Sequence, residues 1–129
     1  MNLDYKIKFR PSAIKDLKKL KDKHLQKLIR DQIFFNIAKA PYEGDKKKAN
    51  LKDIYTRPIT YKKNQYRIAY SINDQEITVE IIQVGSRERF YERLTRRLNK
   101  HWDERLRFYN SISVLASMNG NITVNTIFS

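Results

Sequence analysis

The sequence predicts an α+β domain in which two amino-terminal helices pack on a twisted antiparallel β-sheet, followed by a C-terminal helix and an extra tail. Three patterns support this fold class: a short alternating segment that opens the chain, two amphipathic helical segments after it, and alternating segments separated by turn residues in the middle. With 129 residues, the chain is long enough for one domain with its own hydrophobic core.

The first strand and the two helices follow from the spacing of apolar residues. Residues 5–9 alternate apolar and basic side chains, which is typical of a strand with one buried face. Pro11 and Ser12 suit a helix start, because the first turn does not use the N–H that proline lacks and serine can cap. Apolar residues then recur at three- and four-residue steps: Ala13, Leu17 and Leu20 in one helix, and Leu25, Leu28, Ile29, Ile33 and Ile37 in a second, which ends before Pro41.

The middle of the chain predicts an antiparallel sheet built from hairpins. Residues 42–50 are polar and aperiodic, as in a loop. Residues 54–61 read as a strand in which Pro58 cannot donate a ladder hydrogen bond, so we expect an edge or a bulge there. Residues 65–72 alternate strictly and place Arg67 on the side away from an aromatic face.

A central strand, a charged helix and a tail complete the chain. Residues 76–84 are rich in β-branched side chains, and we expect Gly85 to end this strand. A helix with an apolar stripe is expected from Arg87 to about Phe108. Residues 110–129 lose nearly all charge and contain an Asn-Gly hairpin signal.

The charge of the chain limits its partners. Lys and Arg number 27 against 14 Asp and Glu, which gives a formal net charge of +13 and a pI near 10.0. Such a field attracts polyanions, so nucleic acid, the ribosome or an acidic protein are the natural partners. The alternative is a generally cationic protein without a specific anionic target.

Composition also restricts the compartment and the chemistry. The chain has no cysteine, which excludes disulfides, thiolate metal sites and a cysteine nucleophile. No apolar run approaches the length needed to span a bilayer, and the first ten residues lack the apolar core of a signal peptide. We therefore expect a cytoplasmic protein without a membrane partner.

Three side chains form the candidate catalytic site: Arg67 on a strand, Arg87 just past the end of the next strand, and Tyr91 four residues later, on the same face of the expected helix. Two guanidinium groups can clamp a phosphate and stabilise its transition-state charge, while a phenol can stack on a base or transfer a proton. These groups suit RNA cleavage without a metal or another cofactor. The alternative is that both arginines are solvated surface charges and the tyrosine is half-buried packing.

Other residue patterns favour other chemistries less. His24 and His101 are far apart in the sequence, which disfavours a metal pair, and the serines lack a partnered base. Basic residues beside the sheet are expected to hold RNA by charge, although each lysine is equally an ordinary solvated side chain. The residues of this expected RNA-binding set are Lys46, Lys47, Lys48, Lys52, Lys62, Lys63 and Arg89.

The order of elements and several motifs together resemble the RelE/ParE superfamily of toxins. The matching segments are Tyr5-x-Ile-x-Phe9, Ala13-x-x-x-Leu17, Pro41 with Gly44, Leu51-Lys52, Gln65 to Tyr70, and Ile82 to Arg87 followed by Tyr91. The Tyr-Arg-x-x-Tyr strand and the Gly-x-Arg-x-x-x-Tyr segment are fairly specific in combination. The resemblance covers about residues 3–98, so we expect a toxin domain over 1–98 and a C-terminal extension over 99–129.

The resemblance implies a RelE-like fold and ribosome-dependent cleavage of messenger RNA, in which the ribose 2′-hydroxyl attacks the adjacent phosphate. Arg67 would match the strand arginine that stabilises the phosphate, and Arg87 the arginine after the last strand. Tyr91 would match the aromatic residue that stacks or transfers a proton.

The resemblance also has departures, alternatives and implied partners. Many members carry histidine at Ser86 and lysines in the strand that holds Thr56 and Pro58, so the general base stays open. A second reading is a ParE-like inhibitor of DNA gyrase that cuts no RNA, and a third is a silent binding module. In each case the implied partner is a small acidic antitoxin, which binds operator DNA jointly with the toxin and balances the +13 charge.

Overall fold

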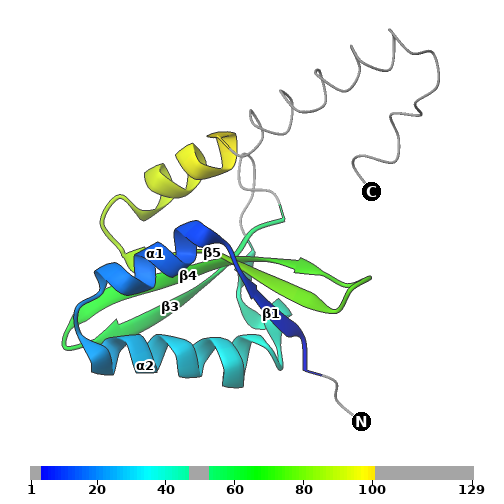
Figure 1. Cartoon of the computed structure of the whole chain (residues 1–129), viewed down its shortest axis with the longest axis horizontal. Coiled ribbons are helices and arrows are strands. Elements are labelled where there is room, and N and C mark those ends of the chain that lie inside the picture. Colours follow the sequence, from blue (N-terminus) through cyan, green and yellow to red (C-terminus); the bar gives the residue numbers. More distant parts are fainter. Residues whose placement is uncertain (1–3, 47–52, 101–129) are drawn as a thin grey trace, which may run out of the picture. The chain divides into compact units, whose positions relative to one another are not determined.

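The computed structural model describes residues 4–46 and 53–100. Its elements are β1 (Lys6–Phe9), α1 (Pro11–Lys19), α2 (Lys23–Asp31), a π-helical segment η1 (Gln32–Ile37), a 3-10 turn η2 (Pro41–Glu43), β2 (Asp45–Lys46), β3 (Tyr55–Tyr61), β4 (Asn64–Asn73) and β5 (Thr78–Ser86) (Figure 1). A further helix occupies residues 90–100. One compact unit ends at Leu94 and a second begins at Thr95, and the fold and site described below belong to the first.

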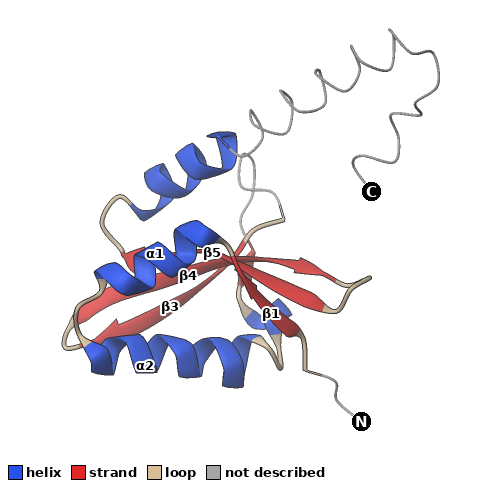
Figure 2. Cartoon of the chain, viewed as in Figure 1, coloured by secondary structure: helices blue, strands red, loops and turns tan. Residues whose placement is uncertain are grey.

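The strands form one five-stranded sheet in the order β1-β5-β4-β3-β2. Strands β2 to β5 pair antiparallel, which confirms the predicted hairpins, whereas β1 pairs with β5 in parallel and makes the sheet mixed. The strands cross as a twisted fan (Figure 2). The predicted α+β fold class is therefore confirmed, and the parallel edge strand follows from the long helical connection between β1 and the rest of the sheet.

Three boundaries differ from the sequence-based expectation. The predicted loop over residues 42–50 contains the short strand β2. Strand β5 continues through Gly85 to Ser86, because Gly85 still pairs with β4. The last helix begins at Phe90, and the tail expected beyond residue 100 lies outside the described residues.

The core lies between α1, α2, η1 and one face of the sheet. Apolar residues at the predicted helical positions meet every second residue of the strands. The fully buried members of this core are Ala13, Leu25, Ile29, Ile33, Ile37, Ile59, Ile68, Tyr70, Val79, Ile81 and Val84. We call this side of the sheet the helix face, and the side that carries Arg67 the site face.

A bulge in β5 changes which of its residues point toward the helix face. Ala69 pairs with Gln83 and Tyr70 with Ile81, so the intervening Ile82 has no partner in β4. Before the bulge, the odd-numbered residues Val79 and Ile81 point to the helix face. After it, the even-numbered residue Val84 does so. Gln83 therefore points to the site face, where its Nε2 donates to the Phe90 carbonyl (2.8 Å) and fixes the start of the last helix.

Helix α1 closes the edge of β5 that β1 leaves open. The pairing with β1 stops at Ile81. Beyond it, the Ser12 hydroxyl donates to the Ile82 carbonyl (3.2 Å) and the buried Asp16 carboxylate accepts from the Val84 N–H (3.0 Å). Two side chains one helical turn apart thus replace the hydrogen bonds of a missing strand.

The open edge predicted at Pro58 is confirmed. Strand β2 pairs with Tyr55 and Thr56, and no strand of the described residues pairs with β3 on that side at the proline. Hydrogen-bonded pairs alternate along the β3–β4 hairpin from its two-residue turn, which makes Pro58 and Arg67 a non-hydrogen-bonded pair. The proline nitrogen therefore faces the edge, and the ladder loses no donor.

Asp74, in the turn between β4 and β5, binds two tyrosines from other parts of the chain. It accepts hydrogen bonds from the Tyr5 and Tyr42 hydroxyls. These hydrogen bonds lower the pKa of Asp74 and, with the carboxylate charge, raise the pKa of Tyr42 to about 12. The contacts fix the far end of the long β4–β5 hairpin against the amino terminus.

Replacing Asp16 tests the closed edge of β5. We expect Asp16→Ala to lower the free energy of unfolding by about 1–3 kcal/mol, because the Val84 N–H stays buried without its acceptor. Urea unfolding followed by circular dichroism measures the change. Lys15→Ala, at an exposed position of the same helix, is the matched control, and an equal loss in both variants would contradict this account.

Candidate functional site

Arg67 lies on β4 and points to the site face, between β3 and the end of β5. Its direct partners are Pro58 on β3 and Gly85 on β5. The side chain is half-buried, and its Nε is buried without a hydrogen bond to any described protein atom. Its guanidinium carbon lies 5.7 Å from the centroid of the Tyr91 ring. Arg67 and Tyr91 are far apart in the sequence but form a cation–π pair in the fold.

Tyr91 is the second residue of the last helix, and its neighbours hold its ring in place. It packs edge-to-face on Phe90 with ring centroids 5.5 Å apart, and its hydroxyl oxygen is shielded from solvent. Phe90 itself is fully buried against the sheet. The ring, rather than the hydroxyl, is the part of Tyr91 that faces the guanidinium.

Arg93 is a member of the site that the sequence reasoning missed. Its guanidinium covers Gly85: a Cβ added at that glycine would stand 2.8 Å from Arg93 Nη2. The same nitrogen donates to the Ser86 carbonyl (3.3 Å), and Nε is buried without a described hydrogen-bond partner. Glycine inside a strand signals the close approach of another group, and this signal was available in the sequence.

No described carboxylate neutralises these two arginines. Among the described residues, neither arginine takes part in an ion pair, whereas Arg10 pairs with Glu80 at 2.7 Å and Lys62 with Asp22 at 3.8 Å. Arg67 and Arg93 therefore stand on the site face as half-buried cations without an anionic partner in this part of the chain. An anion from outside the described residues would gain charge-assisted hydrogen bonds there.

Arg87 lies apart from the position expected for it. It precedes the helix, so it does not share a helix face with Tyr91, and Arg89, with φ of 55°, turns the chain between them. The Arg87 N–H donates to the Gln65 carbonyl (2.9 Å) and its Nη1 to Gln65 Oε1 (3.2 Å). Arg87 is thus fixed to the start of β4, two residues from Arg67.

An open hollow of about 730 Å³ lies beside Arg87 at this end of the sheet. Its walls come from the start of β4 and the end of β5, and its lining residues are Lys63, Asn64, Gln65, Tyr66, Ser86, Arg87 and Glu88. Two cations, two amide side chains and the carboxylate of Glu88 therefore line one accessible space, with a net positive charge. Arg67 and Tyr91 are not among the lining residues.

The remaining residues of the expected RNA-binding set are scattered. Lys46 pairs with Tyr55, whose ring packs on the helix face, so Lys46 lies away from Arg67. Arg89 is exposed in the turn before the helix. Lys47, Lys48 and Lys52 lie outside the described residues.

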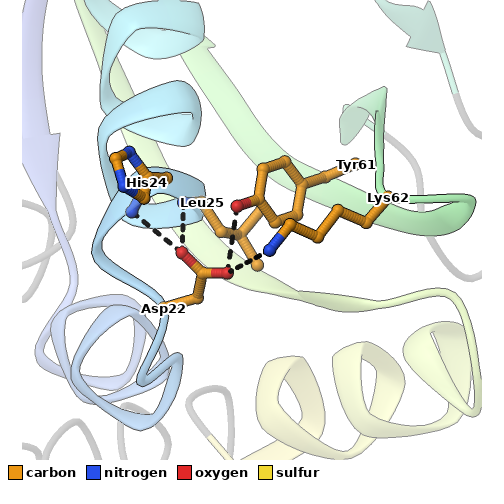
Figure 3. Close-up of polar contacts among 5 residues, drawn as sticks. All are labelled: Asp22, His24, Leu25, Tyr61 and Lys62. Atoms are coloured by element: carbon orange, nitrogen blue, oxygen red, sulfur yellow. Dashed lines mark hydrogen bonds and ion pairs between the residues drawn. The ribbon is translucent and has the colours of Figure 1, made fainter.

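Lys62 belongs to a cluster around Asp22, the N-cap of α2 (Figure 3). One oxygen of Asp22 accepts from the His24 and Leu25 N–H groups, and the other accepts from the Tyr61 hydroxyl (3.0 Å) and faces the Lys62 ammonium. Lys62 also lies over the Tyr61 ring. The cluster anchors one side of the β3–β4 turn to α2.

The turn itself has an unusual backbone. Lys62 and Lys63 are its two central residues, and both have positive φ, of 48° and 68°. Such turns favour Asn-Gly, because a side chain is strained in this conformation. Lys62 turns toward Asp22, whereas Lys63 lines the hollow with Arg87.

Neither a metal cluster nor a membrane span is found in the part of the chain that the structure describes. No three His, Asp or Glu side chains are grouped there so as to hold a metal ion. None of its helices is long and apolar enough to cross a bilayer.

Comparison with known proteins identifies the family. The family model for ParE-like toxins of type II bacterial toxin-antitoxin systems matches residues 7–95, more than half of the chain. The chain belongs to this family. A RelE-like toxin protein of Escherichia coli is 30% identical over 88 residues, which cover 66% of this chain and 85% of that protein.

Solved structures agree with this membership. The intact Escherichia coli RelBE toxin-antitoxin complex matches with 25% identity and a TM-score of 0.54, over 66% of this chain and 99% of that one. The RelBE2 toxin-antitoxin complex of Mycobacterium tuberculosis matches with 24% identity and a TM-score of 0.60, over 67% and 95%. The protein is thus a toxin of the RelE/ParE type with the RelE fold.

The Asp22 cluster gives this toxin an acid-sensitive anchor. Partial desolvation alone would raise the pKa of Asp22, but hydrogen bonds from Leu25, Tyr61 and His24 and the charge of Lys62 outweigh it, so the pKa lies below its ordinary value. A carboxyl with a lowered folded-state pKa stabilises the fold above its unfolded pKa, and this contribution is lost as the pH falls through the folded value.

We expect Asp22→Asn to weaken the loss of stability on acidification, since the substituted residue no longer titrates. Urea midpoints of the wild type and the variant, measured from pH 7 down to pH 3, should converge at the acid end. Asp31→Asn, on the same helix, is the matched control. A difference between wild type and D22N that stays constant with pH would contradict the prediction.

Proposed function

We propose that this toxin cleaves messenger RNA on the ribosome by promoting attack of a ribose 2′-hydroxyl on the adjacent phosphate. The observation that carries the proposal is the guanidinium of Arg67, held against the Tyr91 ring on the site face without a described carboxylate. Because this guanidinium is not used in an ion pair within the described fold, it is available to bind a phosphate group. The RelE-like Escherichia coli relative and the RelE structures support the same reading.

The reaction determines what the site must supply. The 2′-oxygen forms a bond to phosphorus while the bond to the 5′-oxygen breaks, so negative charge grows on the two non-bridging oxygens. Arg67 can donate hydrogen bonds to these oxygens and stabilise that charge. A general base must take one proton from the 2′-hydroxyl, and a general acid must give one to the departing 5′-oxygen. The Lys63 ammonium, which lines the hollow together with Arg87, can supply the second proton.

Tyr91 acts in this proposal as a positioning residue. Its hydroxyl oxygen is shielded from solvent, so the phenol is poorly placed to exchange a proton with RNA. Its ring faces Arg67 and restricts the orientation of the guanidinium. A fixed guanidinium loses less entropy when it binds the reacting phosphate.

The hollow supplies the binding surface for the RNA strand beside the reacting phosphate. Lys63 and Arg87 offer charge to the RNA backbone, and Asn64 and Gln65 offer amide groups to a base. The net charge of +13 favours approach to the ribosome. Lys46, Lys47, Lys48, Lys52 and Arg89 contribute to that approach in the same proposal.

The proposed protein partner is an acidic antitoxin in the cytoplasm. Several structurally similar proteins were solved as toxin-antitoxin complexes, among them the intact Escherichia coli RelBE complex. An acidic partner would neutralise the unpaired arginines of the site face. Operator DNA would be bound only by the complex of the two proteins.

Replacing Arg67 tests the catalytic role. We expect Arg67→Ala to reduce cleavage by about 100- to 1,000-fold, the usual effect of removing one donor to a transition-state oxyanion. Inducible expression in bacteria with mapping of new RNA 5′ ends measures cleavage, and growth curves measure toxicity. Arg30→Ala, at an exposed position of α2, removes the same charge away from the site and should cleave normally.

The outcome depends on where the cuts fall. Cuts inside translated codons that vanish with R67A support the proposed function and its site. Equal cleavage by R67A and the wild type would show that Arg67 has no role in catalysis.

Two substitutions of Tyr91 separate its ring from its hydroxyl. We expect Tyr91→Phe to keep most of the cleavage, because the ring that supports Arg67 remains, and Tyr91→Ala to lose most of it. Single-turnover cleavage of messenger RNA in purified ribosome complexes gives the rate constants. A severe loss in Y91F would instead assign the proton transfer to the hydroxyl.

A second candidate function is inhibition of DNA gyrase, because the matching family is described as ParE-like. The unpaired Arg67 and Arg93 favour the nuclease. Supercoiling by purified gyrase in the presence of the wild-type toxin distinguishes the two functions: we expect no inhibition. Inhibition together with growth arrest but without new 5′ ends would establish the gyrase reading.

A further inference from the structure

We propose that Arg93 is a second phosphate-binding arginine, which holds the same RNA phosphate as Arg67. The proposal rests on the proposed function and extends it to a residue outside the Gly-x-Arg-x-x-x-Tyr motif. Three observations carry it: the position of Arg93 relative to Arg67, the reason for the glycine at position 85, and the charge balance of the two guanidinium groups.

The sheet register places Arg93 next to Arg67. Gly85 and Arg67 are direct cross-strand partners. Side chains of such partners project on the same face with Cβ atoms about 5 Å apart. Gly85 has no side chain, and the Arg93 guanidinium occupies its place, with Nη2, Cζ and Nη1 at 2.8, 3.6 and 3.7 Å from the position of a Cβ. Arg93 therefore reaches the position from which a side chain at residue 85 would contact Arg67.

The backbone does not require glycine at position 85. Gly85 lies within the extended strand β5, and its φ is not in the left-handed region that favours glycine. Glycine inside a strand costs conformational entropy and offers no side chain for packing. Room for the Arg93 guanidinium is thus the structural reason for the missing side chain.

The charges of the two arginines complete the argument. Among the described residues the Arg93 side chain has one hydrogen bond, to the Ser86 carbonyl, and its buried Nε has no hydrogen-bond partner there, as is also true of Arg67 Nε. Two half-buried cations on neighbouring positions repel each other and lose part of their hydration. A phosphodiester with two non-bridging oxygens relieves both effects, because each guanidinium can donate to it.

A structural role is the competing account of Arg93. Its aliphatic stem could simply cover the sheet beside Gly85, as long basic side chains often do. Substitution would then reduce stability without changing phosphate binding. A test must therefore measure how many phosphate contacts the protein makes, in addition to its activity.

Two variants remove the Arg93 guanidinium from its place beside Arg67 in different ways. Arg93→Gln removes the charge, and Gly85→Ala places a methyl group where the guanidinium lies. The alanine meets only the flexible end of a side chain, so we expect G85A to fold while Arg93 moves away. Arg93→Lys keeps the charge but lacks the planar fork, and Arg30→Gln is the matched control for loss of one exposed arginine.

The probe is a single-stranded RNA dodecamer with 2′-O-methyl riboses, which the proposed reaction cannot cut. Fluorescence anisotropy measures its affinity over a range of salt concentrations. We expect R93Q and G85A to reduce the slope of log K against log salt by about 0.7, the effect of one lost phosphate contact on a single strand. R30Q should keep the wild-type slope, and R93K should bind more weakly with a slope close to it.

The double variant Arg67→Gln, Arg93→Gln tests whether both arginines hold one phosphate. If that phosphate is held only when both guanidinium groups are present, R67Q alone, R93Q alone and the double variant reduce the slope equally, whereas additive losses would mean that the two arginines hold separate phosphates and would overturn the proposal. R93Q and G85A with wild-type affinity and slope would overturn the proposal, as would a wild type that does not bind the probe. Because the probe cannot be cut, these outcomes are independent of 5′-end mapping, where absence of cuts by the wild type would overturn the proposed function instead.

Discussion

The single extra residue Ile82 in β5 determines what each face of the sheet presents. Before this bulge, Val79 and Ile81 point into the core beneath the helices, and after it Val84 does so with opposite parity. Without the shift, the polar Gln83 would face the core and Val84 the site. With it, Gln83 and Gly85 share the site face with Arg67, and the last helix is fixed there through the Phe90 carbonyl. The hydrophobic core and the cationic site thus depend on one irregularity in the ladder.

Four acidic residues connect elements of the scaffold to one another. Asp16 binds the open edge of β5, Asp22 caps α2 and holds the β3–β4 turn, Asp74 ties the β4–β5 turn to two tyrosines, and Glu80 pairs with Arg10. Each of these carboxylates stabilises the scaffold away from the site face. None of these four pairs with Arg67 or Arg93, and this is why the proposed function assigns the two guanidinium groups to an anionic partner.

The periodic elements could be predicted from the sequence because burial on one face imposes a regular apolar spacing. The alternation around Arg67 and the helix spacing from Ala13 to Ile37 are of this kind, whereas the edge at Pro58 could be predicted because proline lacks the N–H that a ladder needs. Irregular features could not be predicted from the sequence, because the position of a bulge or of a helix start depends on contacts between residues far apart in the chain. Gly85 was expected to end its strand, which hid its pairing with Arg67 and the approach of Arg93. Placing Arg87 on the helix failed for a related reason: Arg89 turns the chain before the helix begins.

The turn between β3 and β4 gives up stability to keep two lysines. Left-handed backbone at a residue with a side chain costs on the order of 1 kcal/mol, and Lys62 and Lys63 both adopt it. An Asn-Gly pair would fit this geometry with less strain, but it would remove the ammonium that anchors to Asp22 and the one that lines the hollow. Replacing the two lysines by Asn-Gly should therefore relieve strain in the hairpin. Under the proposed function the same change would weaken RNA binding, so stability and toxicity would change in opposite directions at this turn.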